Sequence, residues 1–317
     1  MAKKTSAPAR EPVAKAQPAS DLAAFERWLK STDRSPLTVR GYLQDLRHFA
    51  AWFEPANGKP LTPKLLTPTD VREYRSRLLR RGAAAATVNR RLAALSVYAK
   101  WAVKKKFIEF DPTEDVKAVE QEKLAPKWLD KAQQNALVRT AQRELNATPE
   151  TSPKRGQAMR DLAIIQTLLN TGLRVAELCA LTLDDLALGD RKGWLRVQVG
   201  KGTKQRKVPL NGQAIKALQA WLDMRPAAEH RQVFTGNDLT PLQSRGIQER
   251  LQKLGRLADV PVTPHVLRHS FAKNLINAGV GLEKVAALLG HSSVAVTQRY
   301  TTPSEMDLEE AVARIGD

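Results

Sequence analysis

The sequence is poor in cysteine and in long apolar runs, and each shortage excludes a class of protein. Its one cysteine among 317 residues, Cys179, excludes an internal disulfide and a cysteine-rich zinc site, and it fits the reducing cytoplasm. No run approaches the roughly 18 consecutive apolar residues of a membrane span, which excludes a transmembrane protein. Residues 1–20 are rich in Lys, Ala and Pro without an apolar core, so we expect a flexible basic tail and no secretory signal.

Acidic residues are also scarce relative to basic ones. The chain has 33 Asp and Glu against 51 Lys and Arg, a net charge of +18. Such an excess favours a polyanionic partner, because each Lys or Arg docked on a phosphate releases condensed counterions. Residues 71–106 alone hold 11 basic residues and one acidic residue, Glu73. This clustering is expected of a surface that follows a nucleic-acid backbone, although a merely solvated basic face would have the same composition.

The N-terminal part has the apolar periodicity of helices. Ser35-Pro36 and Thr67-Pro68 each place a capping residue before proline, and apolar residues then recur at steps of three and four. With a helix through residues 22–29 and another after Gly82, residues 21–110 are expected to form a four-helix domain that binds DNA. The candidate DNA-binding residues on its basic face are Arg72, Arg75, Arg90, Lys100 and Lys104.

A second domain follows an acidic linker predicted over residues 111–126, which begins at the helix-breaking Asp111-Pro112. In the domain over residues 127–317, the clearest β signal is a strand, a glycine turn and a strand across residues 194–210. After Asn211 the apolar period is again helical as far as Ile315. The expected fold class is therefore mainly α with a small antiparallel β-sheet, the second domain being α+β.

Six side chains of this second domain suit phosphate chemistry. They are Arg174, Lys201, His265, Arg268, His291 and Tyr300. Thr263-Pro264 predicts a helix start that places His265 and Arg268 on one face, near free backbone N–H groups. Arg174 begins a short helix with Glu177 one turn on, a pair that by itself would be an exposed ion pair of little energy. Each of the six, taken alone, has an ordinary structural explanation.

Together the six residues and their surroundings resemble the active-site boxes of the tyrosine recombinases, the phage integrase family. The matching runs are TGLRVAEL at 171–178, GKGTKQR at 200–206, HVLRH at 265–269, LGH at 289–291 and the tyrosine at 300. Order and spacing agree, with 27 residues from Arg174 to Lys201 and 9 from His291 to Tyr300. The pattern is most similar to Xer-type site-specific recombinases. The resemblance covers the second domain and extends more loosely to the first, which is similar to the family's SAM-like core-binding domain.

The resemblance implies a site-specific recombinase that cleaves and rejoins DNA through a 3′-phosphotyrosyl intermediate and a Holliday junction. Tyr300 would be the nucleophile and Lys201 the general acid, while the two arginines stabilise charge on the phosphate and His265 and His291 hydrogen-bond it. His269 matches the box but is expected to pack. Because the protein–DNA ester conserves the bond energy, no cofactor, ATP or metal is required, and the chain has no GxxxxGK[ST] motif.

The resemblance also implies partners and a location. The expected partners are double-stranded recombination sites and three further copies in a tetramer on paired sites, but no membrane. A second recombinase or an accessory protein is a further candidate partner. Residues 305–315, apolar at helical steps, are a candidate segment for exchange between protomers. The expected location is cytoplasmic and nucleoid-associated. The sequence does not distinguish chromosome dimer resolution from transposon resolution or element integration.

Three other functions remain open at this point. A topoisomerase IB-like enzyme would use the same chemistry to nick, swivel and reseal DNA. A non-catalytic DNA-binding regulator would use the basic helices but has no need for all six side chains. A metal-dependent nuclease would have to draw its carboxylates from Asp184, Asp185 and Asp190, which have the sequence context of a helix end and a turn.

Overall fold

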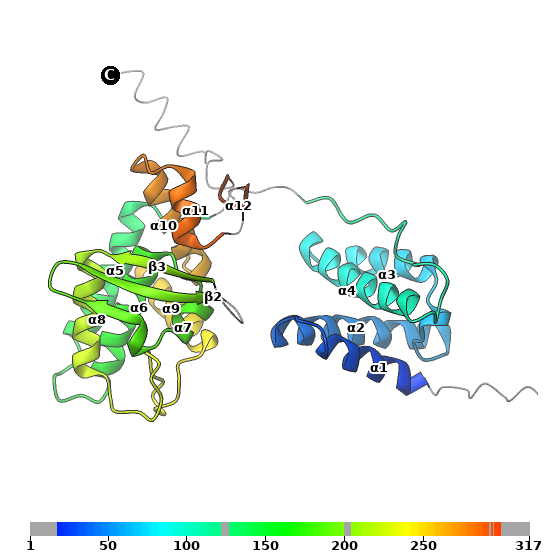
Figure 1. Ribbon diagram of the computed structural model, residues 1–317, viewed down its shortest axis with the longest axis horizontal. Coiled ribbons are helices and arrows are strands. Elements are labelled where there is room, and N and C mark those ends of the chain that lie inside the picture. Colours follow the sequence, from blue (N-terminus) through cyan, green and yellow to red (C-terminus); the bar gives the residue numbers. More distant parts are fainter. Residues whose placement is uncertain (1–17, 122–126, 200–203, 292, 294, 299–317) are drawn as a thin grey trace, which may run out of the picture. The chain divides into compact units, whose positions relative to one another are not determined.

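The structure is a computed structural model that describes residues 18–121, 127–199, 204–291, 293 and 295–298, and it divides into two compact units (Figure 1). Unit 1 is Met1–Lys123 and unit 2 is Leu124–Asp317. The fold is mostly helical with one small antiparallel sheet, which confirms the predicted fold class. Among the described residues, no helix is both long and apolar enough to cross a membrane.

Unit 1 contains the four predicted helices. They are α1 (Pro18–Lys30), α2 (Pro36–Asn57), α3 (Pro68–Arg80) and α4 (Ala85–Lys104), with a short 3-10 turn at Pro63–Leu65. Both expected helix starts form as capping chemistry requires: the Ser35 hydroxyl accepts from the Thr38 N–H at 3.1 Å, and Thr67 forms a reciprocal capping box with Asp70. Apolar faces of the helices meet in one core, in which the Phe25 ring lies edge-on to Tyr98 at 5.1 Å between centroids.

The chain after α4 continues to pack on unit 1. Val116 and Val119 contact its core. The Asn89 side chain of α4 accepts from the Val119 N–H at 2.7 Å and donates to the Val119 carbonyl at 2.8 Å. The Asn89 amide thus satisfies both the N–H and the carbonyl of Val119. The part of the acidic stretch that the structure describes is therefore bound to the helices of this unit.

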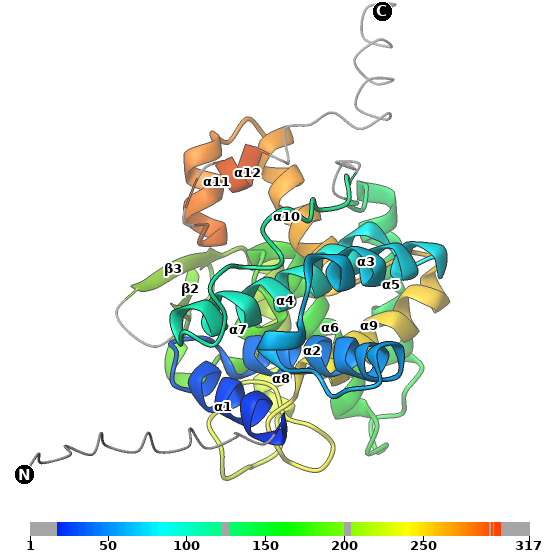
Figure 2. The ribbon, with the colours of Figure 1, turned by 90° about the vertical axis from the view of Figure 1, so that its right-hand side faces the viewer.

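The central helix of unit 2 is α6 (Arg155–Thr171), which is buried along most of its length. The other elements are helices α5, α7 to α12, the 3-10 turn η2 and three strands, with bounds α5 Lys131–Asn146, α7 Val175–Ala180, η2 Leu183–Asp185, β1 Leu186–Leu188, β2 Gly193–Val199, β3 Lys204–Leu210, α8 Gly212–Met224, α9 Ser244–Ala258, α10 Pro264–Asn277, α11 Leu282–Leu289 and α12 Ala295–Gln298. The strands lie in the order β1-β2-β3, all antiparallel. Figures 1 and 2 show α10 and α11 side by side, and α11 contacts β3.

The structure differs from the sequence prediction at three places in this unit. Strand β1 was not expected, because three residues are too few to show an alternating pattern. Residues 225–243 are irregular rather than helical: Val233 and Phe234 are buried from a loop, and Trp221 donates to the Val233 carbonyl at 2.9 Å. The helical period predicted after Asn211 also includes Ala278, but α10 ends at Asn277 and Ala278 is exposed.

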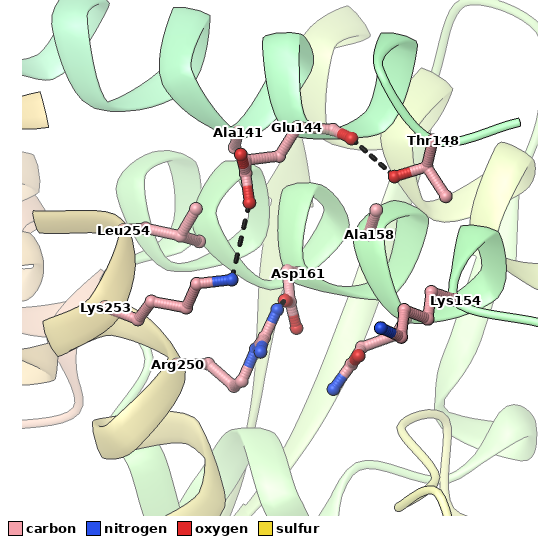
Figure 3. Close-up of a pocket in the computed structure, with 10 residues that line it drawn as sticks. Ala141, Glu144, Thr148, Lys154, Ala158, Asp161, Arg250, Lys253 and Leu254 are labelled. Carbon is pink, nitrogen blue, oxygen red and sulfur yellow. Dashed lines mark hydrogen bonds and ion pairs between the residues drawn. The ribbon is translucent and has the colours of Figure 1, made fainter. Parts of the chain in front are cut away.

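A polar cavity of about 250 Å³ lies between α5, α6 and α9 (Figure 3). Asp161 at its base is buried and ion-paired to Arg160 and Arg250, and Lys253 at its rim is 3.4 Å from Glu144. None of the six candidate catalytic residues lines it. The buried charge of the cavity, Asp161, is thus neutralised by arginines of the protein itself, as a buried charge must be.

Candidate active site

The site is built around Arg268 on α10. The helix begins as predicted, with the Thr263 hydroxyl accepting from the Val266 N–H at 3.2 Å. The guanidinium of Arg268 is buried and donates to the Gly172 carbonyl at 2.6 Å and to the Leu289 carbonyl at 2.9 Å. These carbonyls stand at the C-terminal ends of α6 and α11, where helices leave acceptors unsatisfied. One arginine therefore joins two helix ends that are 117 residues apart in sequence.

Arg174 lies at the start of α7, directly after the end of α6. Its backbone N–H donates to Glu177 at 2.8 Å, and its guanidinium donates to the same carboxylate at 2.9 Å. The side chain of Arg174 is 41 % exposed whereas that of Glu177 is only 10 % exposed. The pair of Arg174 and Glu177 is therefore not an ordinary exposed ion pair, because the carboxylate is largely buried while the guanidinium keeps an open side.

Glu177 is buried because a further arginine covers it. Arg206 of β3 binds its two carboxylate oxygens at 3.0 and 2.7 Å, and Arg268 approaches to 4.0 Å. Burial raises the pKa of the Glu177 carboxyl, but the hydrogen bonds from Arg206 and from the Arg174 backbone outweigh it, and the pKa lies below its usual value. The carboxylate is thus ionised at neutral pH, and three guanidinium groups around one acid leave a net positive charge.

His291 follows the end of α11 and joins the same cluster. Its Nε2 atom is 3.0 Å from a guanidinium nitrogen of Arg268, and its Nδ1 atom is 2.9 Å from the Thr297 hydroxyl. Since a guanidinium N–H can only donate, Nε2 accepts in this contact and the ring proton of the neutral imidazole is assigned to Nδ1. The two contacts fix both the tautomer and the orientation of the ring.

The six predicted catalytic residues do not all fall in the described part of the chain. The structure brings together Arg174, Arg268 and His291. His265 lies one turn before Arg268 on α10 and is exposed, with its ring centroid 6.4 Å from that of His269. Lys201, Tyr300 and the candidate exchange segment at 305–315 lie outside the described residues. So do residues 1–17 of the flexible tail predicted over residues 1–20, whereas residues 18–20 form the start of α1, so the tail prediction is wrong there.

Two members of the cluster were missed as site residues. Glu177 was noticed only for its spacing to Arg174, and Arg206 only as a letter in a matching run. The burial of both follows from a contact between β3 and α7, whose partners the local sequence does not identify.

The candidate DNA-binding residues of unit 1 fall into two groups. Arg72, Lys100 and Lys104 are exposed, whereas Arg75 is half-buried. Arg90 is also exposed but forms an ion pair with Asp45, a buried carboxylate of α2. Four of the five side chains are therefore exposed to solvent, and Arg75 is exposed only in part.

Two of the three carboxylates that a metal-dependent nuclease would need, Asp184 and Asp185, are engaged elsewhere. Asp184 accepts from Arg231 at 2.6 Å, and Asp185 accepts from the Thr182 hydroxyl at 2.6 Å as a turn cap. Within the described ranges, no three His, Cys, Asp or Glu side chains are grouped closely enough to hold a metal ion. This arrangement does not favour the nuclease.

Comparisons with known proteins agree with the architecture. Residues 127–306 match the model of the phage integrase family, and residues 22–106 match the phage integrase N-terminal SAM-like domain. The tyrosine recombinase XerC of Neisseria gonorrhoeae is 34 % identical over 305 residues, which cover 93 % of this chain and 94 % of that protein. The XerC protein of Pelotomaculum thermopropionicum is 34 % identical over 283 residues, covering 84 % and 88 %.

The solved structures share the fold. The XerH site-specific recombinase bound to its palindromic difH substrate, in a post-cleavage complex, superposes with a TM-score of 0.73 at 21 % identity, covering 93 % of this chain and 85 % of that one. A family model that spans more than half of the chain and relatives above 30 % identity over nearly its whole length establish its kinship. The chain belongs to the phage integrase family of tyrosine recombinases.

Proposed function

We propose that this protein is a site-specific DNA recombinase of the Xer type. The observation that carries the proposal is the convergence of Arg174 and Arg268 on one ionised carboxylate, with His291 held against the second arginine. The proposal extends to this chain what the relatives' names state of them: XerC proteins are tyrosine recombinases, and the XerH structure holds its difH substrate.

The chemistry is a transfer of one phosphate ester to another. Tyr300 passes its phenolic proton to His265, and its oxygen attacks the phosphorus and forms the 3′-phosphotyrosyl bond while the bond from phosphorus to the 5′-oxygen breaks. Lys201 gives a proton to the departing 5′-oxygen, which leaves as a hydroxyl. Attack by a 5′-hydroxyl of another strand reverses these steps, joins the new strand and builds a Holliday junction. Because one ester replaces another, the sequence of steps requires neither ATP nor a metal ion.

The two arginines contribute differently to charge stabilisation. The burial of Arg268 and its bonds to two carbonyls hold its guanidinium in a fixed direction. Arg174 keeps an exposed guanidinium edge that can donate two parallel hydrogen bonds to a phosphate. Fixed donors lose little free energy to reorganisation as negative charge grows on the non-bridging oxygens. The exposed His265 on the first turn of α10 is the remaining candidate donor to that phosphate.

Assembly on DNA belongs to the same proposal. Double-stranded recombination sites are the partner, bound by the basic face of unit 1, and four copies act on two paired sites in the cytoplasm, alone or with a second recombinase or accessory protein. Removing residues 304–317 should abolish pairing of two sites and spare binding to one site, measured by gel shift. Unimpaired pairing would refute exchange through this segment.

Trapping the covalent intermediate tests the proposed function. Footprinting on DNA that flanks the protein's own gene locates the site, and a duplex of that site with a nick beside the cleavage point lets the short fragment diffuse away. The wild type should then leave a protein–DNA adduct on a denaturing gel, and Tyr300→Phe should bind equally well without an adduct. An adduct with Tyr300→Phe shows that the nucleophile is misassigned, and no adduct with the wild type favours a non-catalytic regulator.

The topoisomerase alternative needs a second assay, because it forms the same adduct. A plasmid with two directly repeated sites should give two separate circles with a recombinase. Relaxed plasmid without exchanged segments would favour nicking and closing instead.

A further inference from the structure

Arg206 has all three of its guanidinium nitrogens bound within the protein. Its Nε atom donates to the Leu288 carbonyl at 2.9 Å, and its Nη1 and Nη2 atoms donate to the two oxygens of Glu177 at 3.0 and 2.7 Å. The side chain is only 10 % exposed. A guanidinium in this position is directed at the protein rather than at a substrate, so it differs in kind from Arg174, whose edge is open.

These three hydrogen bonds join elements that carry three candidate catalytic residues. Glu177 binds Arg174 on α7 and lies 4.0 Å from Arg268 on α10. Leu288 lies three residues before His291, and His291 contacts Arg268. A displacement of the Arg206 guanidinium would therefore move the carboxylate that orients one arginine and the turn that carries the histidine.

Arg206 is also packed closely against the backbone of Gly290. A Cβ atom at Gly290 would lie 2.6 Å from the Nη1 atom of Arg206 and 2.9 Å from its Cζ atom. The guanidinium thus packs directly on the backbone of the turn before His291. Planarity and a fixed fork allow arginine to bind a carboxylate, a carbonyl and a glycine surface together, which a lysine ammonium cannot do.

We propose that Arg206 is a positioning residue for strand cleavage, which holds Glu177 and the turn at residues 288–291 in the arrangement that directs Arg174 at the phosphate and keeps His291 against Arg268. The proposal rests on the proposed function, since it assigns a part in that reaction. Arg206 itself does not touch the substrate.

Replacing Arg206 by glutamine tests this role against a matched control. Lys207→Gln removes the same charge from the neighbouring position of β3, where the lysine is exposed and stacks over Trp194. At saturating nicked duplex we expect Arg206→Gln to form the adduct roughly 10²-fold more slowly, as for a 1 Å misplacement of reacting groups. Arg206→Lys should recover a small part of that rate, and Lys207→Gln should react at the wild-type rate.

The pH profile separates positioning from a general loss of structure. Glu177 is faced by Arg174 from its own helix start, by Arg206 from β3 and by Arg268 from α10. Without Arg206, burial acts on the carboxyl with less opposition, so Glu177 should take up a proton at a higher pH than in the wild type. The acid side of the rate profile of Arg206→Gln should therefore move to higher pH. A second replacement, Glu177→Gln, should remove this movement and add little further loss.

A direct measurement keeps this proposal distinct from the proposed function. The chain has five histidines, so the ring resonances of His291 can be assigned by comparison with His291→Gln. They should shift in Arg206→Gln and stay unchanged in Lys207→Gln, in the free protein as well as on DNA. Unchanged resonances, a wild-type cleavage rate, or an equal loss of rate at every pH would each overturn the positioning role. Absence of an adduct with the wild type would overturn the proposed function, while the resonances still decide the role of Arg206.

Discussion

Replacing Gly290 by alanine should slow cleavage through a steric effect on a neighbouring side chain. Gly290 ends α11 in the left-handed conformation, with φ at +67°. An added Cβ atom would lie 2.6 Å from the Nη1 atom of Arg206, where ordinary contacts need at least about 3.5 Å. The guanidinium must therefore retreat by about 0.9 Å, enough to stretch its bonds to Glu177 beyond hydrogen-bond length.

The same substitution at Gly279 isolates the clash from backbone strain. Gly279 is also left-handed, with φ at +76°, but an added Cβ atom meets nothing within 4 Å. Both alanine variants should lose about 1–2 kcal/mol because an L-residue is strained in this conformation. In a unit of this size that loss lowers the melting temperature by roughly 2–4 °C per kcal/mol. Only Gly290→Ala should also disturb Arg206.

The assay is the rate of adduct formation on saturating nicked duplex, at a temperature well below both melting transitions. Gly290→Ala should react about 10- to 100-fold more slowly than Gly279→Ala, following the sensitivity of catalysis to displacements near 1 Å. Thermal unfolding of the two variants provides the control for folding. Equal cleavage rates in the two variants would refute the reasoning, because strain alone would then explain both.

Further predictions concern the fold and the charges. Arg268→Lys should slow adduct formation by about 10²–10³-fold with little change in DNA affinity. An ammonium group cannot bind both helix-end carbonyls and also orient a donor. Rapid-quench kinetics measure the rate of adduct formation, and gel shifts measure the DNA affinity. Trp101→Ala should cost unit 1 about 3–5 kcal/mol in urea unfolding, since the ring is buried. Asp161→Ala should destabilise unit 2 by about 3–5 kcal/mol in thermal unfolding, because it leaves the buried Arg160 and the half-buried Arg250 without their carboxylate. The pKa of Glu177 is lowered on folding, so its contribution to stability is present above the unfolded value of about 4.3 and is lost as pH falls through the folded pKa. Melting temperatures of Glu177→Gln should accordingly depend less on pH below about 4.3 than those of the wild type.

Helix starts were predictable because the interactions that form them are local. Ser35, Thr67 and Thr263 each cap a backbone N–H three residues ahead, with proline next to the cap. Such a signal lies entirely within four residues of sequence. The irregular stretch at 225–243 shows the opposite case, because its buried Val233 is held by the side chain of Trp221 and by a bridge between Thr182 and Gln232.

The residue types of the candidate site were predictable, whereas the contacts that hold them were not. Arg268 could be selected because few side chains suit a phosphate and because its box matched a family. Its acceptors, however, are the carbonyls of Gly172 and Leu289, and every residue has a carbonyl. Only the packing of α10 against α6 and α11 determines which carbonyls it meets. Likewise, spacing identified the pair of Arg174 and Glu177 but not its burial.

Arg206 was open to detection by a simple strand argument. In β3 the side chains at alternate positions share a face, which groups Arg206 with Val208 and Leu210, and both of these are buried. A charged residue in register with core positions is costly unless an opposite charge meets it. The acid that meets it is Glu177 of α7, whose side chain is also only 10 % exposed, so each explains the burial of the other. Two residues of opposite charge therefore occupy neighbouring positions where the apolar pattern predicts core residues. Natural sequences depart from such patterns mainly at functional sites, so this pair indicates one.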